Sequence, residues 1–207
     1  TQINKEIPSA MVLTYKKLRK PVIKSLETEN YNFDRYIVIS KDIKEELIKK
    51  TKIEENKIEL VEYPVKINFE FLPDESKILE MKKHFDLPTN RRIVLFYSNE
   101  NGYKDIEKII KKILKNEKLL KNGFFIILTR NNRSQYEKLF DMVGENPSFR
   151  VIGFSEQFYE YMSVSDILLT SADTHSLKQG FMLKKPIIVT YMTNKDEKDN
   201  IDFLLDK

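Results

Sequence analysis

The stretch of residues 166–200 constrains the fold more strongly than any other part of the chain. It contains two short apolar runs, residues 166–170 and 186–189, and between them residues 177–184 place apolar side chains at helical spacing. This pattern predicts a strand, a helix and a second strand. Two strands joined by such a helix pair in parallel, and helices cover both faces of a parallel sheet. The stretch therefore predicts an α/β fold.

Polar loops follow both of these predicted strands. Residues 171–176 follow the first strand and are rich in the Ser, Thr and Asp side chains that begin helices, and residues 190–200 follow the second. Ligands of open parallel sheets bind beyond the carboxyl ends of the strands. We therefore expect the binding chemistry of the chain at this edge.

The alternation of strands and helices continues through most of the remaining chain. Further strands are predicted at residues 92–97, 124–129 and 149–152, with helices at residues 76–85, 103–120, 134–143 and 155–163. A regular alternation of this length is typical of an open, doubly wound parallel sheet. The sequence thus predicts one α/β domain over residues 67–207.

The residues before Pro64 are predicted to be the end of a preceding domain. They show a helical pattern at residues 10–27, a strand at 35–40, a helix at 41–50 capped by Ser40, and a strand at 57–61. Two strands are too few for a domain, and residues 65–74 lose periodicity as a linker does. We therefore divide the chain into residues 1–66 and 67–207. Because it begins at Thr1 rather than Met, we expect it to be a piece of a longer protein.

Composition excludes several kinds of site. The chain has no cysteine and two isolated histidines, His84 and His175, which excludes thiolate and histidine-rich metal sites. No apolar run approaches the ~20 residues that a membrane-spanning helix needs. The net charge of +4 is a small surplus, and the lysines of residues 104–121 alternate with isoleucines as in an amphipathic helix with a solvated face. We therefore expect no nucleic-acid partner.

Four short segments share their order and spacing with one enzyme family. They are Gly153-Phe154, Ser165-Asp166, Pro186-Ile187-Ile188 and Glu197-Lys198-x-Asn200. In these segments the chain resembles the carboxyl-terminal half of glycosyltransferase family 28, which includes the plant monogalactosyldiacylglycerol synthases and the bacterial diacylglycerol glucosyltransferases. The resemblance extends from residue 33 onward and preserves the spacing better than the residues.

The resemblance implies a two-lobed glycosyltransferase of the GT-B fold. Residues 67–207 would be its Rossmann-like, parallel-sheet lobe, which binds a UDP-sugar, and residues 1–66 would be a piece of the amino-terminal acceptor lobe with the crossing linker. The implied reaction moves a hexose from the UDP-sugar to a lipid or other membrane-associated acceptor, as in glycolipid synthesis, without a metal or cofactor. The implied location is cytoplasmic, in peripheral contact with the inner face of the membrane.

The resemblance also implies a set of donor-binding residues. They are Ser98, Gly153, Phe154, Ser171, Thr174, Ser176, Gln179, Glu197 and Asn200. Phe154 lies where the family contacts the uracil, and Gln179 stands where the family has a glutamate that binds the ribose. Glu197 and Asn200 correspond to contacts with the sugar hydroxyls. The loops at Ser98 and Ser171 would offer backbone N–H groups and the positive end of a helix dipole to the diphosphate.

The chain departs from the family at two glycine-rich turns. Residues 98–102 and 172–175 replace them, and Glu100 and Asp173 bring negative charge toward the phosphates. A non-catalytic relative that binds a protein or glycan is therefore an alternative, and a sugar-nucleotide epimerase of the same fold is a third. The family's catalytic histidine belongs to the amino-terminal lobe. We assign no catalytic residue in this chain and expect the chain alone to be inactive.

Four of these donor-binding residues, and His175, also have a simpler structural interpretation. Phe154 could be a core aromatic residue, and Gln179 an exposed residue of a helix. His175 could be a residue near a helix start with a local hydrogen bond rather than a base. Glu197 and Asn200 could begin a surface helix. These alternatives predict different burial and different partners for the side chains.

Overall fold

The computed structural model describes residues 9–13, 23–24, 26, 33–62, 66–97, 102–192 and 194–205. The chain separates into two compact units, Thr1–Pro64 and Val65–Lys207. This division lies two residues before the boundary that we placed between residues 66 and 67. The longer second unit contains the predicted binding edge.

Within the described residues, the first unit is a small parallel sheet with strands in the order β1-β2-β3. Its elements are β1 (Ala10–Leu13), β2 (Arg35–Val38), α2 (Lys41–Lys50), η1 (Glu55–Lys57) and β3 (Ile58–Leu60). As predicted, Ser40 caps α2, because its side chain accepts a hydrogen bond from the N–H of Ile43 at 3.2 Å. Val38, Ile43 and Leu47 are buried in the core of this unit.

The helical pattern predicted for residues 10–27 is wrong at its beginning, where the chain forms the strand β1. This strand pairs in parallel with β2 along its whole length, so the described part of the unit contains three strands rather than the predicted two. Helical backbone is described at residues 23–24 and 26, and the other residues between Leu13 and Phe33 lie outside the described part. A run of four residues is too short to distinguish the periodicity of a strand from that of a helix. Its structure is therefore decided by pairing with a neighbouring strand.

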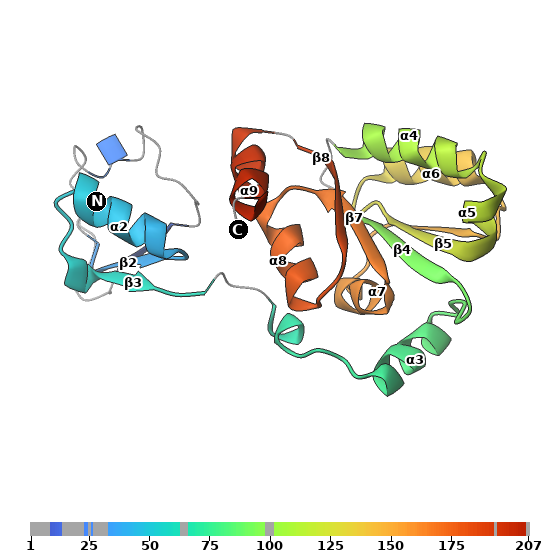
Figure 1. Ribbon diagram of the computed structural model, residues 1–207, viewed down its shortest axis with the longest axis horizontal. Helices are drawn as coiled ribbons and strands as arrows, with labels where there is room; N and C mark the ends of the chain where they lie inside the picture. Colours follow the sequence, from blue (N-terminus) through green and yellow to red (C-terminus); the bar gives the residue numbers. More distant parts are fainter. Residues whose placement is uncertain are drawn as a thin grey trace. The chain divides into compact units, whose positions relative to one another are not determined.

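In the described part of the second unit, five strands form one sheet in the order β6-β5-β4-β7-β8, and every pairing is parallel (Figure 1). They are β4 (Arg92–Tyr97), β5 (Gly123–Leu128), β6 (Phe149–Ile152), β7 (Ile167–Ser171) and β8 (Ile187–Tyr191). These strands are the predicted ones, so the parallel α/β domain is confirmed. The strand order reverses between β4 and β7, and a sheet of this kind binds ligands at such a switch point.

Helices cover both faces of this sheet (Figure 1). α3 (Glu75–His84), α7 (Phe158–Val164) and α8 (Thr174–Met182) pack into one core, and α4 (Tyr103–Ile113) and α6 (Arg133–Val143) pack into the other. Successive strand residues such as Leu95 and Phe96 enter opposite cores, as the pleat of a strand requires. The unit begins with η2 (Ile67–Glu70), and α5 (Glu117–Asn122) and α9 (Lys195–Leu205) follow α4 and β8.

The helix predicted over residues 103–120 is divided into α4 and α5. The side chain of Asn116 caps α5 by accepting a hydrogen bond from the N–H of Leu119 at 3.1 Å. Ile106 and Ile110 are fully buried, whereas the lysines of both helices are exposed. The predicted amphipathic pattern with a solvated lysine face is therefore confirmed, but a side-chain cap interrupts it.

α8 lies close to the sheet because residue 180 is glycine. A Cβ atom at Gly180 would lie 2.7 Å from Cδ1 of Ile187 and 3.0 Å from Cδ2 of Leu168. Such distances leave no room for a side chain without movement of the neighbouring strands' side chains. The close approach also buries Gln179, the preceding residue, which is 1% exposed.

Candidate functional site

A hollow of about 180 Å³ opens at the carboxyl edge of the sheet in the second unit. The ends of neighbouring strands form part of its wall: Tyr97 ends β4, Leu128 ends β5 and Gly153 follows β6. Its other lining residues are Lys66, Arg130, Phe154, Ser155, Phe158, His175 and Gln179. This carboxyl-edge hollow lies where open parallel sheets bind their ligands.

Of the predicted donor-binding residues, Gly153, Phe154 and Gln179 belong to the described lining of the carboxyl-edge hollow. Phe154 is 65% exposed, so it is not a core aromatic residue. Gln179 is buried, so it is not an exposed helix residue. An exposed aromatic ring and a buried amide thus face one space, where they offer a flat apolar surface and polar atoms to the same ligand.

The buried amide of Gln179 is only partly satisfied by the protein. Its Nε2 lies 2.9 Å from Nε2 of His175, one turn earlier on α8. Its Oε1 is buried and has no hydrogen-bond partner among the described residues. An unpaired buried acceptor costs about 1–3 kcal/mol. A ligand that donates a hydrogen bond to this oxygen would remove that cost.

The surroundings of His175 favour its neutral form. Partial burial lowers the pKa of His175 below its ordinary value of 6.5. Asp173 raises the pKa of His175, and the positive charges of Arg130 and Lys66 lower it. A neutral imidazole can accept the amide hydrogen of Gln179 at Nε2. His175 therefore makes the local helix hydrogen bond that we considered as the alternative to a catalytic base.

The loop between β7 and α8 satisfies its own polar groups. Asp173 accepts a hydrogen bond from the N–H of Ser176 through Oδ1 and one from the hydroxyl of Ser171 through Oδ2, both at 2.9 Å. Ser171 and Ser176 are buried, and neither belongs to the described lining of the hollow. The carboxylate of Asp173 thus occupies the helix start at which we placed the diphosphate.

The start of α9 is tied to this same loop. Asn200 is 3% exposed, and its Nδ2 donates to the carbonyl of Ala172 at 2.8 Å and to the hydroxyl of Thr174 at 3.1 Å. Glu197 is also buried, so these two residues do not begin a surface helix. Neither belongs to the described lining of the hollow, and their contact with sugar hydroxyls stays a prediction. Ser98 lies outside the described residues.

Sequence reasoning missed four polar residues of the described lining of the hollow: Lys66, Tyr97, Arg130 and Ser155. The guanidinium of Arg130 lies 5.2 Å from the centre of the Tyr97 ring, within cation–π distance. Burial raises the pKa of Tyr97, which keeps its hydroxyl protonated. A search of the end of every predicted strand would have found both residues, because Tyr97 ends β4 and Arg130 follows β5. Lys66 lies in the predicted linker and not at the end of a predicted strand, so no sequence pattern marked it as a lining residue.

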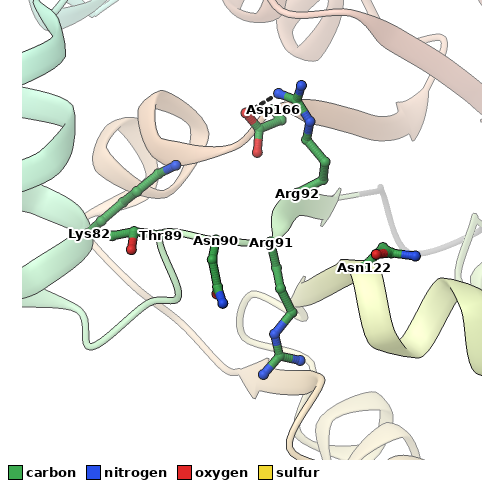
Figure 2. Close-up of a pocket in the computed structure, with 7 residues that line it drawn as sticks. All are labelled: Lys82, Thr89, Asn90, Arg91, Arg92, Asn122 and Asp166. Atoms are coloured by element: carbon green, nitrogen blue, oxygen red, sulfur yellow. Dashed lines mark hydrogen bonds and ion pairs between the residues drawn. The ribbon is translucent and has the colours of Figure 1, made fainter.

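A larger hollow, of about 430 Å³, lies at the opposite, amino-terminal edge of the sheet (Figure 2). Its lining residues are Lys82, Thr89, Asn90, Arg91, Arg92, Asn122 and Asp166. Figure 2 shows the side chains of Arg91 and Arg92 pointing in opposite directions, and Arg92 pairs with Asp166 at 3.3 Å. No buried polar atom without a partner is found among these described residues. The two arginines of the larger hollow therefore do not converge on one ligand.

No helix in the described part of the chain is long and apolar enough to cross a membrane. The same residues contain no group of three or more His, Cys, Asp or Glu side chains that could hold a metal ion.

Sequence comparison relates the chain to one kind of enzyme, although no family model matches it. It is 21% identical over 178 residues to the processive diacylglycerol beta-glucosyltransferase of Bacillus subtilis, covering 85% of this chain and 44% of the relative. It is 23% identical over 199 residues to the enzyme of that name from Staphylococcus epidermidis, covering 96% of this chain and 48% of the relative. The resemblance to the diacylglycerol glucosyltransferases is confirmed, at low identity. The chain spans about half the length of the curated relatives it matches.

Solved structures share the fold of the chain. A glycosyltransferase from Rickettsia africae superposes with a TM-score of 0.56 at 15% identity, over 95% of this chain and 60% of that one. The Anabaena protein Alr3699/HepE, in complex with UDP and glucose, superposes with a TM-score of 0.53 at 11% identity. The superposition covers 96% of this chain and 61% of that one. A UDP-GlcNAc 2-epimerase from Neisseria meningitidis, bound to UDP-GlcNAc, superposes with a TM-score of 0.67 at 17% identity. The superposition covers 96% of this chain and 56% of that one. The predicted Rossmann-like fold of GT-B proteins is confirmed, and at these identities the likeness concerns the fold alone.

Proposed function

We propose that Val65–Lys207 is the donor-binding lobe of a glycosyltransferase that moves a hexose from a UDP-sugar to a lipid or other membrane-associated acceptor. The observation that carries this proposal is the carboxyl-edge hollow, which is lined by Gly153, the exposed Phe154 and Gln179, whose Oε1 is buried and has no partner among the described residues. The names of the relatives support a diacylglycerol-type acceptor. Such an acceptor would bring the protein into peripheral contact with a membrane, which we place at its cytoplasmic face.

Two contacts would hold the uridine in this hollow. The uracil ring lies against the exposed face of Phe154, since a flat base gains free energy by stacking on an aromatic side chain. A ribose hydroxyl donates a hydrogen bond to Oε1 of Gln179, the acceptor that lacks a partner among the described residues. The same hydroxyl has no charged partner at this position, because the chain has Gln179 where the family has a glutamate.

Hexose transfer needs more groups than this lobe would supply. An acceptor hydroxyl attacks the anomeric carbon of the sugar, a base takes the hydroxyl proton, and UDP leaves with its negative charge stabilised. We place the acceptor and the base on an amino-terminal lobe and the stabilisation of UDP in the carboxyl-edge hollow. The proposal includes no metal or cofactor. The chain by itself is expected to transfer no sugar.

One observation favours a second candidate, a non-catalytic relative that binds a protein or glycan partner. Asp173 fills the start of α8 with its own carboxylate, so the helix offers fewer N–H groups to a diphosphate. In this candidate the fold is kept and nucleotide binding is lost.

Titration calorimetry of this chain with UDP, UDP-glucose and ADP separates the two candidates. The donor-lobe proposal predicts saturable binding of both uridine nucleotides and weaker binding of ADP. Binding of none of the three nucleotides would reject the donor lobe and leave the non-catalytic relative as the better account.

The titration of His175 is expected to report the charge bound in the hollow. NMR should give a midpoint below 6.5, because burial lowers the pKa of His175, and His84→Asn identifies the signal by leaving one histidine. The unfolded chain then takes up the proton first, so the free energy of unfolding falls as pH falls below 6.5 toward this midpoint. Bound UDP should raise the midpoint, because phosphate charge favours the imidazolium. A midpoint that UDP leaves unchanged would place the phosphates elsewhere.

A further inference from the structure

The described lining of the carboxyl-edge hollow carries positive charge, and the carboxylate of Asp173, which lies outside this lining, opposes it at His175. This lining contains Arg130 and Lys66 but no Asp or Glu. Neither cation forms an ion pair with any residue in the described part of the chain. Both lower the pKa of His175, which shows that their charges act on the same space. A hollow with this charge is suited to an anionic group.

The backbone of Arg130 is held in an uncommon conformation. Its φ of 56° is in the left-handed region, which residues other than glycine adopt rarely and which is concentrated at functional positions. The residue lies two positions after the end of β5, and its guanidinium lies 5.2 Å from the centre of the Tyr97 ring. This arrangement orients a planar group with several N–H donors at the edge of the hollow.

The start of α8, in contrast, is already occupied. Asp173 accepts hydrogen bonds from the N–H of Ser176 and the hydroxyl of Ser171, and Thr174 is bonded to Asn200. A phosphate at this helix start would have to displace a carboxylate that caps the helix and would meet its negative charge. The helix start is therefore a poor anion site in this chain.

We infer that Arg130 and Lys66 bind the diphosphate of the donor, and that the start of α8 does not. This inference rests on the proposed function, because it names the group that the hollow holds next to the uridine. In this chain the carboxylate of Asp173 caps the N-terminus of α8, and the side chains of Arg130 and Lys66 bind the phosphates instead. Arg130 offers a planar fork of donors, and Lys66 adds a point charge.

Calorimetric titration of uridine and UDP into this chain tests the inference, because the two ligands differ only in the diphosphate. UDP should bind about tenfold more tightly than uridine. Arg130→Ala should remove most of this difference and leave uridine binding within about twofold, and Lys66→Ala should act in the same direction. Arg133→Ala is the matched control: this arginine, three residues later, is 90% exposed and pairs with Glu137 on α6. It should change neither affinity.

Asp173→Asn distinguishes the two anion sites, since Asn still caps a helix but carries no charge. We expect it to change UDP affinity by less than about threefold, a fraction of the Arg130→Ala effect. The inference is overturned if Arg130→Ala and Lys66→Ala leave UDP affinity unchanged, or if Asp173→Asn tightens UDP binding tenfold or more. A chain that binds uridine and UDP equally would refute the inference alone. A chain that binds neither would refute the proposed function.

Discussion

Phe154→Ala is expected to weaken the binding of UDP to this chain about 5- to 150-fold, because stacking of a base on an aromatic ring is worth about 1–3 kcal/mol. The ring is 65% exposed at the carboxyl-edge hollow, so its removal costs the fold little apolar burial. We expect the free energy of unfolding to stay within about 0.5 kcal/mol of the unsubstituted chain. Calorimetric titration and urea unfolding measure the two quantities on the same samples.

Phe71→Ala is a close control for this substitution. Phe71 is also 65% exposed, belongs to the same unit and is absent from the described lining of the hollow. It should leave both UDP affinity and stability unchanged. If Phe154→Ala and Phe71→Ala bind UDP equally well, the uracil does not lie on Phe154.

Gln179→Met is expected to separate binding from stability. The substitution removes Oε1, so a ribose hydroxyl that enters the hollow loses its acceptor, which costs about 1–3 kcal/mol or about 5- to 150-fold in UDP affinity. The folded chain loses the hydrogen bond to His175 and also loses an unpaired buried oxygen. These two changes oppose each other, so the free energy of unfolding should change by less than about 1 kcal/mol. Methionine also adapts well to an irregular buried space.

Lys178→Met is the control on the same helix, because Lys178 precedes Gln179 and is absent from the described lining of the hollow. UDP should bind this variant as tightly as the unsubstituted chain. The opposite pattern for Gln179→Met, with unchanged UDP affinity and a loss of stability above about 3 kcal/mol, would make Gln179 a structural residue of α8 alone.

Most of the second unit could be predicted from the sequence because its strands are strongly marked. β4 and β6 begin and end at the predicted residues, since each is a short run of mostly apolar side chains. β1 could not be predicted, because its four residues suit a strand or a helix and only the pairing with β2 decides. The break between α4 and α5 was not predicted, because it depends on a single side chain, that of Asn116, which caps α5.

Part of the lining of the candidate site could be predicted from the position of residues relative to the predicted strands. Gly153 and Phe154 follow a strand of the sheet, and the end of a parallel strand places them at the binding edge. A helix start at residues 171–176 was predicted, but the sequence did not show which of the polar side chains caps α8; in the structure it is Asp173. Arg130 and Lys66 reach the hollow from segments far apart in the chain, so only the fold brings them together.

A crystal structure of this chain grown with UDP tests the central claim most directly. We expect the uracil to lie against Phe154, a ribose hydroxyl to lie within hydrogen-bond distance of Oε1 of Gln179, and the diphosphate to lie beside Arg130. UDP bound at the amino-terminal edge of the sheet near Arg91, or a nucleotide-free carboxyl-edge hollow in crystals soaked to saturation, would contradict it.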